Sequence, residues 1–248
     1  MPDNPDRLIV LEGATNFRDL GGYATDEGRT LRWGMVYRAD GLGRLTDRDH
    51  DRLAGLGIRS VVDFRCDAER ARLPNRLPTD LAGRTHHLSI EPGRRDVLLA
   101  HLDAKTAKPE HGRDHMIDVY RSFPIEHAAQ FRRFFELLLD DEAVPLVFHC
   151  AAGKDRTGFA AALFLMALGV HAETVRADYL LTNRHWRNVS PGLLPPDVLA
   201  PIIAADLDYL DAGLAAIDHA HGSIDAFFEQ CLGLDAGNRA RLRDKFMA

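Results

Sequence analysis

The chain has 248 residues, 46% of them hydrophobic, and a formal net charge of −6. This length and apolar content suit one globular domain with a large core, and the acidic balance argues against general nucleic-acid binding. Its three scattered cysteines give no disulfide framework, which fits a reducing compartment and a free thiol, and they do not form the paired thiolates of a zinc site.

The N-terminal part of the chain predicts short, interrupted elements. Residues 1–7 are polar and acidic and are not a secretory signal, so we expect a cytoplasmic protein or one exported without a recognisable signal peptide. Residues 8–11 predict a strand, residues 16–23 a turn-rich corner, and residues 31–37 strand pieces divided by a glycine. A threonine N-cap followed three residues later by aspartate predicts a helix over residues 46–56.

The middle of the chain alternates between strand and helix patterns. Residues 59–64 and 85–90 predict strands. Residues 91–112 are charged and poorly periodic, so we expect a mobile insertion there. Helical periodicity returns over residues 113–123 and 125–139.

A buried strand over residues 144–148 leads into a glycine-containing loop and then into a helix-rich C-terminal region. The helices expected there span residues 157–168, 171–182, 196–219, 222–232 and 235–246. The longest apolar stretch, residues 159–170, is too short to span a bilayer. Strands early and helices late predict an α/β domain with a helical cap.

The loop itself has the sequence His-Cys-Ala-Ala-Gly-Lys-Asp-Arg-Thr-Gly, which begins at His149. A strand, a tight loop and a helix start can form a nest of backbone N–H groups that binds an oxyanion. Cys150 in that position is biased toward the nucleophilic thiolate, and Arg156 offers a planar fork for two phosphate oxygens. A nucleotide-binding P-loop is excluded, because Phe148 and Asp155 stand where its first glycine and its Ser or Thr are needed. The pattern is typical of a cysteine phosphatase.

The same loop resembles that of the atypical bacterial protein-tyrosine phosphatases. Three further stretches match this family: Asn-Phe-Arg-Asp-Leu-Gly-Gly from Asn16, Tyr-Arg-Ala-Asp from Tyr37, and Val-Asp-Phe-Arg from Val62. The resemblance implies a single tyrosine-phosphatase-like domain over residues 1–248, with a mostly parallel central sheet, a helical lid and a helical region over 171–248. It also implies no metal or organic cofactor.

Each loop residue has an expected role. Cys150 attacks phosphorus, and Arg156 orients the phosphoryl group. The backbone amides that hold the equatorial oxygens belong to Ala151, Ala152, Gly153, Lys154, Asp155 and Arg156. Thr157 is expected to donate its hydroxyl to the Cys150 sulfur, and His149 to order the loop.

Two carboxylates are candidates for the general acid. Neither tryptophan starts the Trp-Pro-Asp sequence on which common tyrosine phosphatases carry their acid. The family branch implies Asp155, and Asp63 is the second candidate, for which a structural ion pair is the competing interpretation.

The substrate class is also open. Lys154 is expected to add charge at the mouth of the site, as in phosphoinositide phosphatases, but Ala151 stands where those enzymes commonly hold a second lysine. The leading substrate is a protein phosphorylated chiefly at tyrosine but also at serine or threonine. One alternative is an enzyme that acts on phosphoinositides, and another is a non-catalytic module that only binds phosphate. Buried ion pairs that brace the site are expected from the matching stretches, at Arg18, Asp19, Arg38, Asp40 and Arg65.

Overall fold

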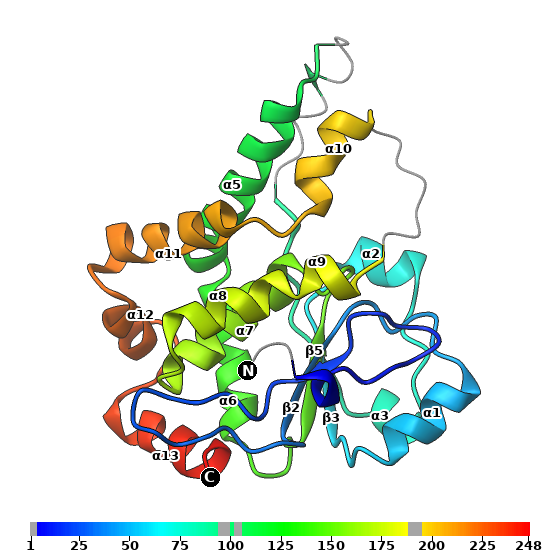
Figure 1. The fold of residues 1–248 in the computed structure, drawn as a ribbon, viewed down its shortest axis with the longest axis vertical. Helices are drawn as coiled ribbons and strands as arrows, with labels where there is room; N and C mark the ends of the chain where they lie inside the picture. The colour runs from blue at the N-terminus through cyan, green and yellow to red at the C-terminus, as the bar shows by residue number, and fades with distance from the viewer. Residues whose placement is uncertain (1–3, 94–99, 102–105, 188–194) are drawn as a thin grey trace.

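The computed structural model describes residues 4–93, 100–101, 106–187 and 195–248, and a five-stranded sheet lies at its centre (Figure 1). The strands, taken in chain order, are β1 Arg18–Asp19, β2 Val36–Ala39, β3 Ser60–Asp63, β4 Thr85–His87 and β5 Leu146–His149. They lie side by side in the order β1, β2, β5, β3, β4. β1 pairs antiparallel with β2, and the other pairs are parallel, which confirms the predicted α/β class with a mostly parallel sheet.

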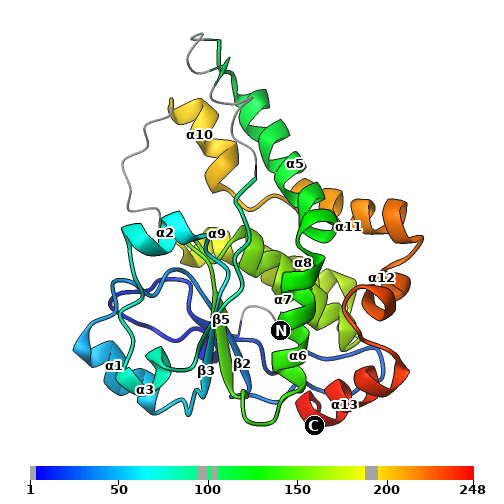
Figure 2. The same cartoon turned by 180° about the vertical axis from the view of Figure 1, so that it is seen from behind.

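Helices cover both faces of the sheet (Figures 1 and 2). In the described residues they are α1 Asp47–Ala54, α2 Asp67–Arg72, α3 Thr79–Ala82, α5 Pro109–Glu126, α6 Ala128–Leu139, α7 Asp155–Ala167, α8 Ala172–Leu180, α9 Thr182–His185, α10 Pro196–Ile203, α11 Leu207–His221, α12 Ile224–Gln230 and α13 Ala236–Phe246, preceded by the 3-10 turn η1 Pro5–Arg7.

The sheet separates two hydrophobic clusters, because successive residues of a strand point to opposite faces. Val62 and Phe148 belong to the larger cluster, which α6, α7 and the C-terminal helices complete. Val61 and Val147 belong to the smaller one, which α1 and α3 cover. The central strands β3 and β5 are buried on both faces, and their apolar residues follow one another without polar alternation.

The sequence predictions for the N-terminal part were partly wrong. The expected strand over residues 8–11 is reduced to one isolated bridge between Leu8 and Arg18, because β1 offers an edge of two residues for pairing. The expected strand pieces over 31–37 form a ladder from Val36 onward. The helix predicted over 46–56 is confirmed as α1, whose N-cap Thr46 and Asp49 form a reciprocal capping box.

The helices predicted over residues 113–123 and 125–139 were divided at Pro124, but Pro124 does not end a helix. α5 continues through Pro124 to Glu126, and α6 starts at Ala128. A proline in the last turn removes one backbone hydrogen bond, and the helix ends two residues later, so the penalty is small. At its other end α5 begins at Pro109, inside the expected insertion 91–112; residues 94–99 and 102–105 of that insertion lie outside the described part of the chain.

The single helix predicted over 196–219 is in fact two helices, α10 and α11. Ala204 is extended, with ψ at 143°, and Asp206 starts α11 as an N-cap whose side chain accepts from the Asp208 amide. The apolar periodicity ran across this break because both helices bury one face, which a periodicity argument cannot separate.

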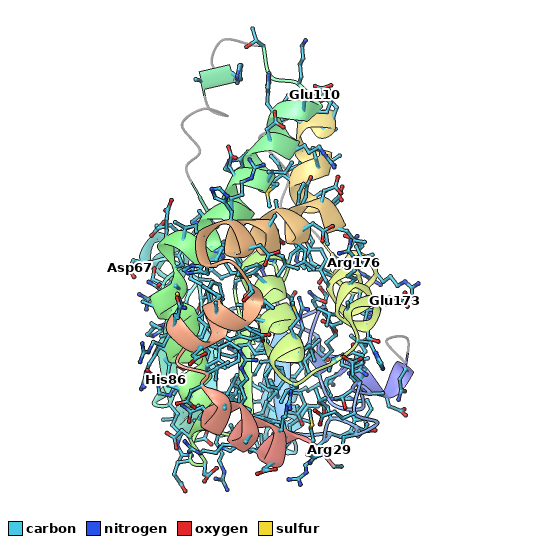
Figure 3. The ribbon with its side chains drawn as sticks, turned by 90° about the vertical axis from the view of Figure 1, so that its left-hand side faces the viewer. Arg29, Asp67, His86, Glu110, Glu173 and Arg176 are labelled. Atoms are coloured by element: carbon cyan, nitrogen blue, oxygen red, sulfur yellow. The ribbon has the colours of Figure 1, made fainter. Side chains whose placement is uncertain are left out.

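α5 and α10 run side by side away from the sheet, toward the end marked by Glu110 in Figure 3. Gly112 makes this close contact possible, since a Cβ there would lie 2.6 Å from the Val198 carbonyl oxygen. We name this pair of helices the α5/α10 arm. Its base lies beside the loop that follows β5.

Candidate active site

The loop after β5 lies at the carboxyl edge of the parallel strands. Ala39 and Asp63 pair with His149, so β2 and β3 end on either side of the point where Cys150 leaves the sheet. Open parallel sheets usually bind ligands at this edge. Cys150 is buried, with 1% of its surface exposed, and α7 begins five residues later at Asp155.

Gly153 sets the curvature of the loop. Its φ is +63°, and a Cβ at this position would lie 2.4 Å from the Ala39 carbonyl oxygen, so glycine alone fits here. Neighbouring groups hold the loop carbonyls from behind: the Gly41 amide donates to Ala151 O at 3.0 Å, and Arg38 Nη2 donates to Gly153 O at 2.8 Å.

These contacts occupy the carbonyls and leave the amides unused. Across the described residues, no hydrogen bond is formed from the amides of 151–156 to a protein acceptor. Unpaired amides that follow a strand and open a helix attract an anion, because the positive end of the α7 dipole adds to their partial charges. The loop is therefore built as an oxyanion site.

Arg156 is fixed by a bidentate ion pair with Glu69 of α2. Nη1 and Nη2 donate to the two carboxylate oxygens at 2.6 and 2.8 Å, and Nη1 also donates to Ile90 O at 3.1 Å. Burial opposes the charge, but the hydrogen bonds to Glu69 and the charge of a Cys150 thiolate raise the pKa of Arg156. In return Arg156 holds the pKa of Glu69 at about 2, against the effect of burial.

The other edge of the guanidinium remains available. The bonds to Glu69 and Ile90 use both protons of Nη1 and one of Nη2, so Nε–H and the second Nη2 proton form a free fork. None of the described residues accepts from it. This edge can bind two oxygens of a phosphoryl group while Glu69 holds the opposite edge.

Thr157 does not make its expected contact. Its Oγ1 is buried and has no hydrogen-bond partner among the described residues, so the predicted donation to the Cys150 sulfur is not formed here. Buried hydroxyls are normally satisfied. An orphaned donor in the first turn of α7, on the residue after Arg156, is available to an anion in the loop.

His149 is held as a neutral ring behind the loop. Burial lowers its pKa, so the proton lies on one nitrogen. Nδ1 lies 3.0 Å from Cys150 O and must donate to it, and Nε2 then accepts from Asn75 Nδ2 at 3.2 Å. The distance of 3.7 Å from Nε2 to Asp63 is too long for a hydrogen bond. His149 thus fixes the peptide of Cys150.

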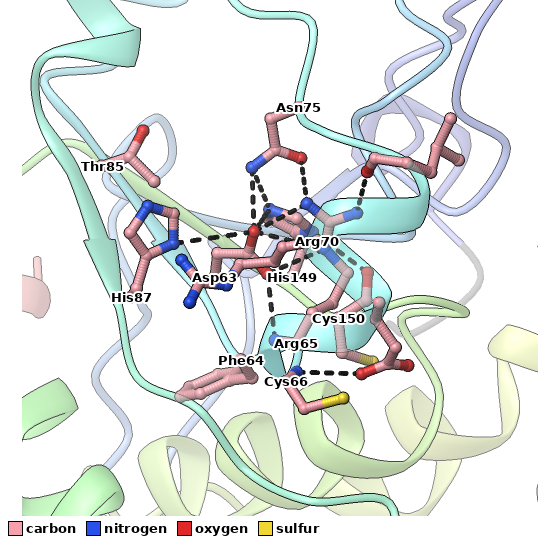
Figure 4. Close-up of polar contacts among 12 residues, drawn as sticks. Asp63, Phe64, Arg65, Cys66, Arg70, Asn75, Thr85, His87, His149 and Cys150 are labelled. Atoms are coloured by element: carbon pink, nitrogen blue, oxygen red, sulfur yellow. Dashed lines mark hydrogen bonds and ion pairs between the residues drawn. The ribbon is translucent and has the colours of Figure 1, made fainter.

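Asp63 is fully engaged as a structural carboxylate (Figure 4). Arg65 donates from Nε at 2.9 Å and from Nη2 at 2.7 Å, and Asn75 Nδ2 donates at 3.0 Å. Burial would raise its pKa, but the charge that His149 carries once it is protonated in acid, together with the hydrogen bonds from Arg65, holds the pKa of Asp63 at about 2. A carboxylate held in this way is poorly placed to donate a proton near neutral pH.

Asp155 lies in a different setting, at the base of the α5/α10 arm. It accepts from the Tyr120 hydroxyl at 3.0 Å and pairs with Lys154 Nζ at 2.9 Å, and its side chain keeps 23% of its surface exposed. Tyr120 in turn shares a 2.7 Å hydrogen bond with the Tyr179 hydroxyl. Asp155 is thus both oriented and accessible, unlike Asp63.

The side chain of Lys154 corrects a prediction. It was expected to add charge at the mouth, but it is buried, and Nζ donates to the carbonyls of Ile202 at 2.7 Å and Ala204 at 2.9 Å. These carbonyls belong to the end of α10 and lack helical partners, so a lysine satisfies them. Lys154 joins the loop to the α5/α10 arm.

The expected buried ion pairs are formed by the arginines. Arg18 Nε and Arg38 Nη1 both donate to Asp178, at 3.1 and 2.6 Å, and Arg65 pairs with Asp63. Burial alone would raise the pKa of Asp178, but the two arginines hold it well below its usual range. Asp178 thereby anchors Arg38, which holds the Gly153 carbonyl.

The two expected aspartates differ from this pattern. Asp19 accepts from the backbone amides of Gly21 and Gly34, both at 2.7 Å. Asp40 accepts from the amides of Thr15 and Asn16. Both carboxylates fix turns, and neither forms an ion pair with a described residue.

Four partners of the site were missed in the sequence: Glu69, Asn75, Tyr120 and Asp178. Glu69 carried a weak signal, as the third residue of a short acidic helix start after Cys66. The other three carry no local pattern that distinguishes them from ordinary helix or loop residues.

Two negative findings concern the residues that the structure describes. They include no group of three His, Cys, Asp or Glu side chains placed to hold a metal ion. None of their helices has the length and apolarity to cross a membrane.

Comparison with known proteins gives consistent matches. A family model described as the tyrosine phosphatase family matches residues 9–248. A Cupriavidus necator protein named "putative tyrosine-protein phosphatase" is 34% identical, over 97% of this chain and 88% of that protein. The triple specificity protein phosphatase PtpB of Mycobacterium tuberculosis is 30% identical, over 94% of this chain and 96% of its own length. Among solved structures, TpbA of P. aeruginosa aligns over 79% of this chain and 96% of its own chain, at 17% identity and a TM-score of 0.38.

Proposed function

Because this chain belongs to the tyrosine phosphatase family and is a phosphatase, we propose that it hydrolyses phosphotyrosine in proteins through a phosphocysteine intermediate on Cys150. The observation that carries the proposal is the loop itself. A buried cysteine and an arginine with one free edge border amides that have no acceptor among the described residues.

The proposed chemistry proceeds in two displacements. The Cys150 thiolate forms a bond to phosphorus while the ester oxygen leaves, and Asp155 gives that oxygen a proton. Water then attacks the phosphocysteine, Asp155 takes up a proton from it, and the sulfur–phosphorus bond breaks to release inorganic phosphate. Support for Asp155 over Asp63 comes from its exposure and from its hydrogen bond with Tyr120.

The loop amides and Arg156 act on charge in this scheme. The amides of 151–156 hold the equatorial oxygens, and the free fork of Arg156 binds two of them. Glu69 keeps the guanidinium in place before substrate arrives, so no ordering of that side chain is needed during the reaction. The orphaned hydroxyl of Thr157 is a further donor for the sulfur when it leaves as thiolate.

The breadth of substrate is part of the proposal. The Mycobacterium tuberculosis relative is named a triple specificity protein phosphatase, which supports a substrate range wider than phosphotyrosine, and we propose that this range includes phosphoserine and phosphothreonine. The burial of Lys154 weakens the phosphoinositide alternative, because this lysine was expected to add charge at the mouth of the site. We also propose that residues 9–248, the range of the family match, act as one catalytic unit.

A substrate panel tests the proposal. We expect turnover of an aryl phosphate and of phosphotyrosine peptides, inhibition by orthovanadate, no effect of a chelator, and loss of activity in Cys150→Ser. Acid quenching during turnover should trap phosphate on wild-type protein and none on Cys150→Ser. Equal inactivity of both proteins, with phosphopeptide binding retained, would instead establish a non-catalytic binding module.

A further inference from the structure

A cavity of about 570 Å³ opens directly beside the phosphate loop. Ala151 and Ala152, the first two residues after Cys150, form part of its wall, and so does Glu69, which holds Arg156. The cavity therefore adjoins the proposed phosphate site. Its volume is in the range of small-molecule sites and is larger than one phosphate requires.

Four arginines line this cavity, and they come from segments far apart in the chain. Arg44 follows β2, Arg65 follows β3, Arg72 ends α2 and Arg187 follows α9. The guanidinium of Arg65 is already paired with Asp63. The other three guanidiniums are on exposed residues, and no described residue gives them a hydrogen bond or an ion pair.

The acidic residues of the wall do not neutralise these three arginines. Glu12 accepts from the hydroxyl of Thr46 at 2.8 Å and pairs with Arg48 at 3.3 Å. Asp40 accepts backbone amides, and Glu69 is bound to Arg156. Each carboxylate thus has its own partners, so the cavity holds an excess of positive charge next to the loop.

We propose that this cavity binds a second anionic group of the protein substrate, a phosphorylated or acidic side chain near the phosphoresidue that is hydrolysed. The proposal rests on the proposed function and adds a specificity site to it. Arg44, Arg72 and Arg187 are the residues that bind the second group. Arginine suits this role, because its fork matches both phosphate and carboxylate oxygens.

The wall also favours a peptide over an inositol lipid. Trp186 and Leu73 add apolar surface on which neighbouring side chains of a peptide can pack. Lys154 is turned away into the base of the α5/α10 arm, so the loop adds no lysine for a polyphosphorylated ring. We therefore assign the second group to a protein chain.

The test compares three phosphotyrosine peptides that differ in their neighbours: neutral residues, glutamates on both sides, or a second phosphoresidue. We expect a higher kcat/KM for the two anionic peptides. In Arg44→Gln and Arg187→Gln, the ratio of kcat/KM between anionic and neutral peptides should fall by about two- to fivefold each, since single exposed ion pairs are weak. A variant carrying both changes and Arg72→Gln should lose the preference.

Arg121→Gln is the matched control, since Arg121 is exposed on α5 and does not line the cavity. The ratio should be unchanged in that protein. Binding of the same three peptides to Cys150→Ser, measured by fluorescence anisotropy, gives a second measurement that needs no turnover.

Three outcomes would overturn the proposal: equal kcat/KM for the peptides, a preference that survives in the triple variant, or variants that slow only the hydrolysis of phosphoinositide in phosphatidylcholine vesicles. These outcomes are distinct from failure of the proposed function. If the proposed function is wrong, aryl phosphate turnover will be absent or will persist in Cys150→Ser, independently of the substitutions at the three arginines.

Discussion

Glu69 accepts a hydrogen bond from each terminal nitrogen of Arg156, at 2.6 and 2.8 Å, although 87 residues separate the two in the chain. The pair occupies one edge of the guanidinium and leaves the other edge free. Glu69 also accepts from the Cys66 amide at 3.0 Å, so its carboxylate is itself fixed to the start of α2. The arginine is therefore oriented by a carboxylate that touches no phosphate.

The first prediction concerns this pair. Glu69→Gln keeps the size of the side chain but sets an amide NH2 against a guanidinium donor, so Arg156 loses its fixed direction. We expect kcat/KM for an aryl phosphate to fall by about 10- to 100-fold, because a small misplacement of a catalytic group can have an effect of this size. Steady-state kinetics measure it. Glu136→Gln on α6, in an exposed pair with Arg133, is the control and should be unaffected; equal activity of Glu69→Gln and wild type would refute the role.

The second prediction concerns the proton donor. Asp155→Asn should lower kcat by about 10²- to 10⁴-fold for an alkyl phosphate, whose leaving oxygen needs a proton, and much less for a nitrophenyl ester. Tyr120→Phe removes the 3.0 Å hydrogen bond to Asp155 and should give a smaller loss with the same dependence on leaving group. The measurement is a series of leaving groups. If Asp155→Asn slows all esters equally, the carboxylate acts in another way.

The third prediction is a loss of stability in acid. The pKa of Asp63 is about 2 in the folded protein and 3.8 in an ordinary setting, so folding favours its ionised form. The resulting stabilisation, about 2 kcal/mol, is fully present above the ordinary pKa. As the pH falls from about 4 toward 2, the unfolded chain takes up the proton first, and the contribution disappears.

Urea unfolding between pH 2.5 and 6 measures this dependence. Asp63→Asn should be less stable at pH 6, because Arg65 is left buried without its partner, and should show a flatter decline in acid. Asp67→Asn, whose side chain is exposed, should keep the wild-type slope. A slope that is the same in wild type and Asp63→Asn would mean that another group carries the acid sensitivity.

The strand, loop and helix around Cys150 could be predicted because their signals are local. An apolar run, a glycine and a helix start lie within about twenty residues, and parallel strands bring their carboxyl ends to one edge. The orientation of Lys154 could not be predicted. It depends on the break between α10 and α11, which exposes carbonyls that only a folded chain places beside the loop.

The residues that hold the loop in place could not be predicted either. Asp178 looks like a polar residue of a helix, and nothing near it in sequence indicates that Arg18 and Arg38 converge on it. Such pairs arise from tertiary packing between segments about 140 to 160 residues apart. Sequence patterns therefore identify the residues of the loop, whereas the residues that hold the loop in place require the fold.

The last prediction separates backbone strain from a steric clash within the loop. Gly153 and Gly28 both have positive φ, +63° and +76°, but a Cβ would lie 2.4 Å from Ala39 O at Gly153 and would meet nothing within 4 Å at Gly28. Gly28→Ala should therefore lose about 1–2 kcal/mol of stability from strain alone and keep its activity.

Gly153→Ala must also push the loop away from β2, so its amides and Arg156 lose their common geometry. We expect a larger loss in the urea midpoint and a fall in kcat/KM of about 100-fold. Equal effects of the two substitutions on kcat/KM would show that the curvature set by Gly153 is not what builds the oxyanion site.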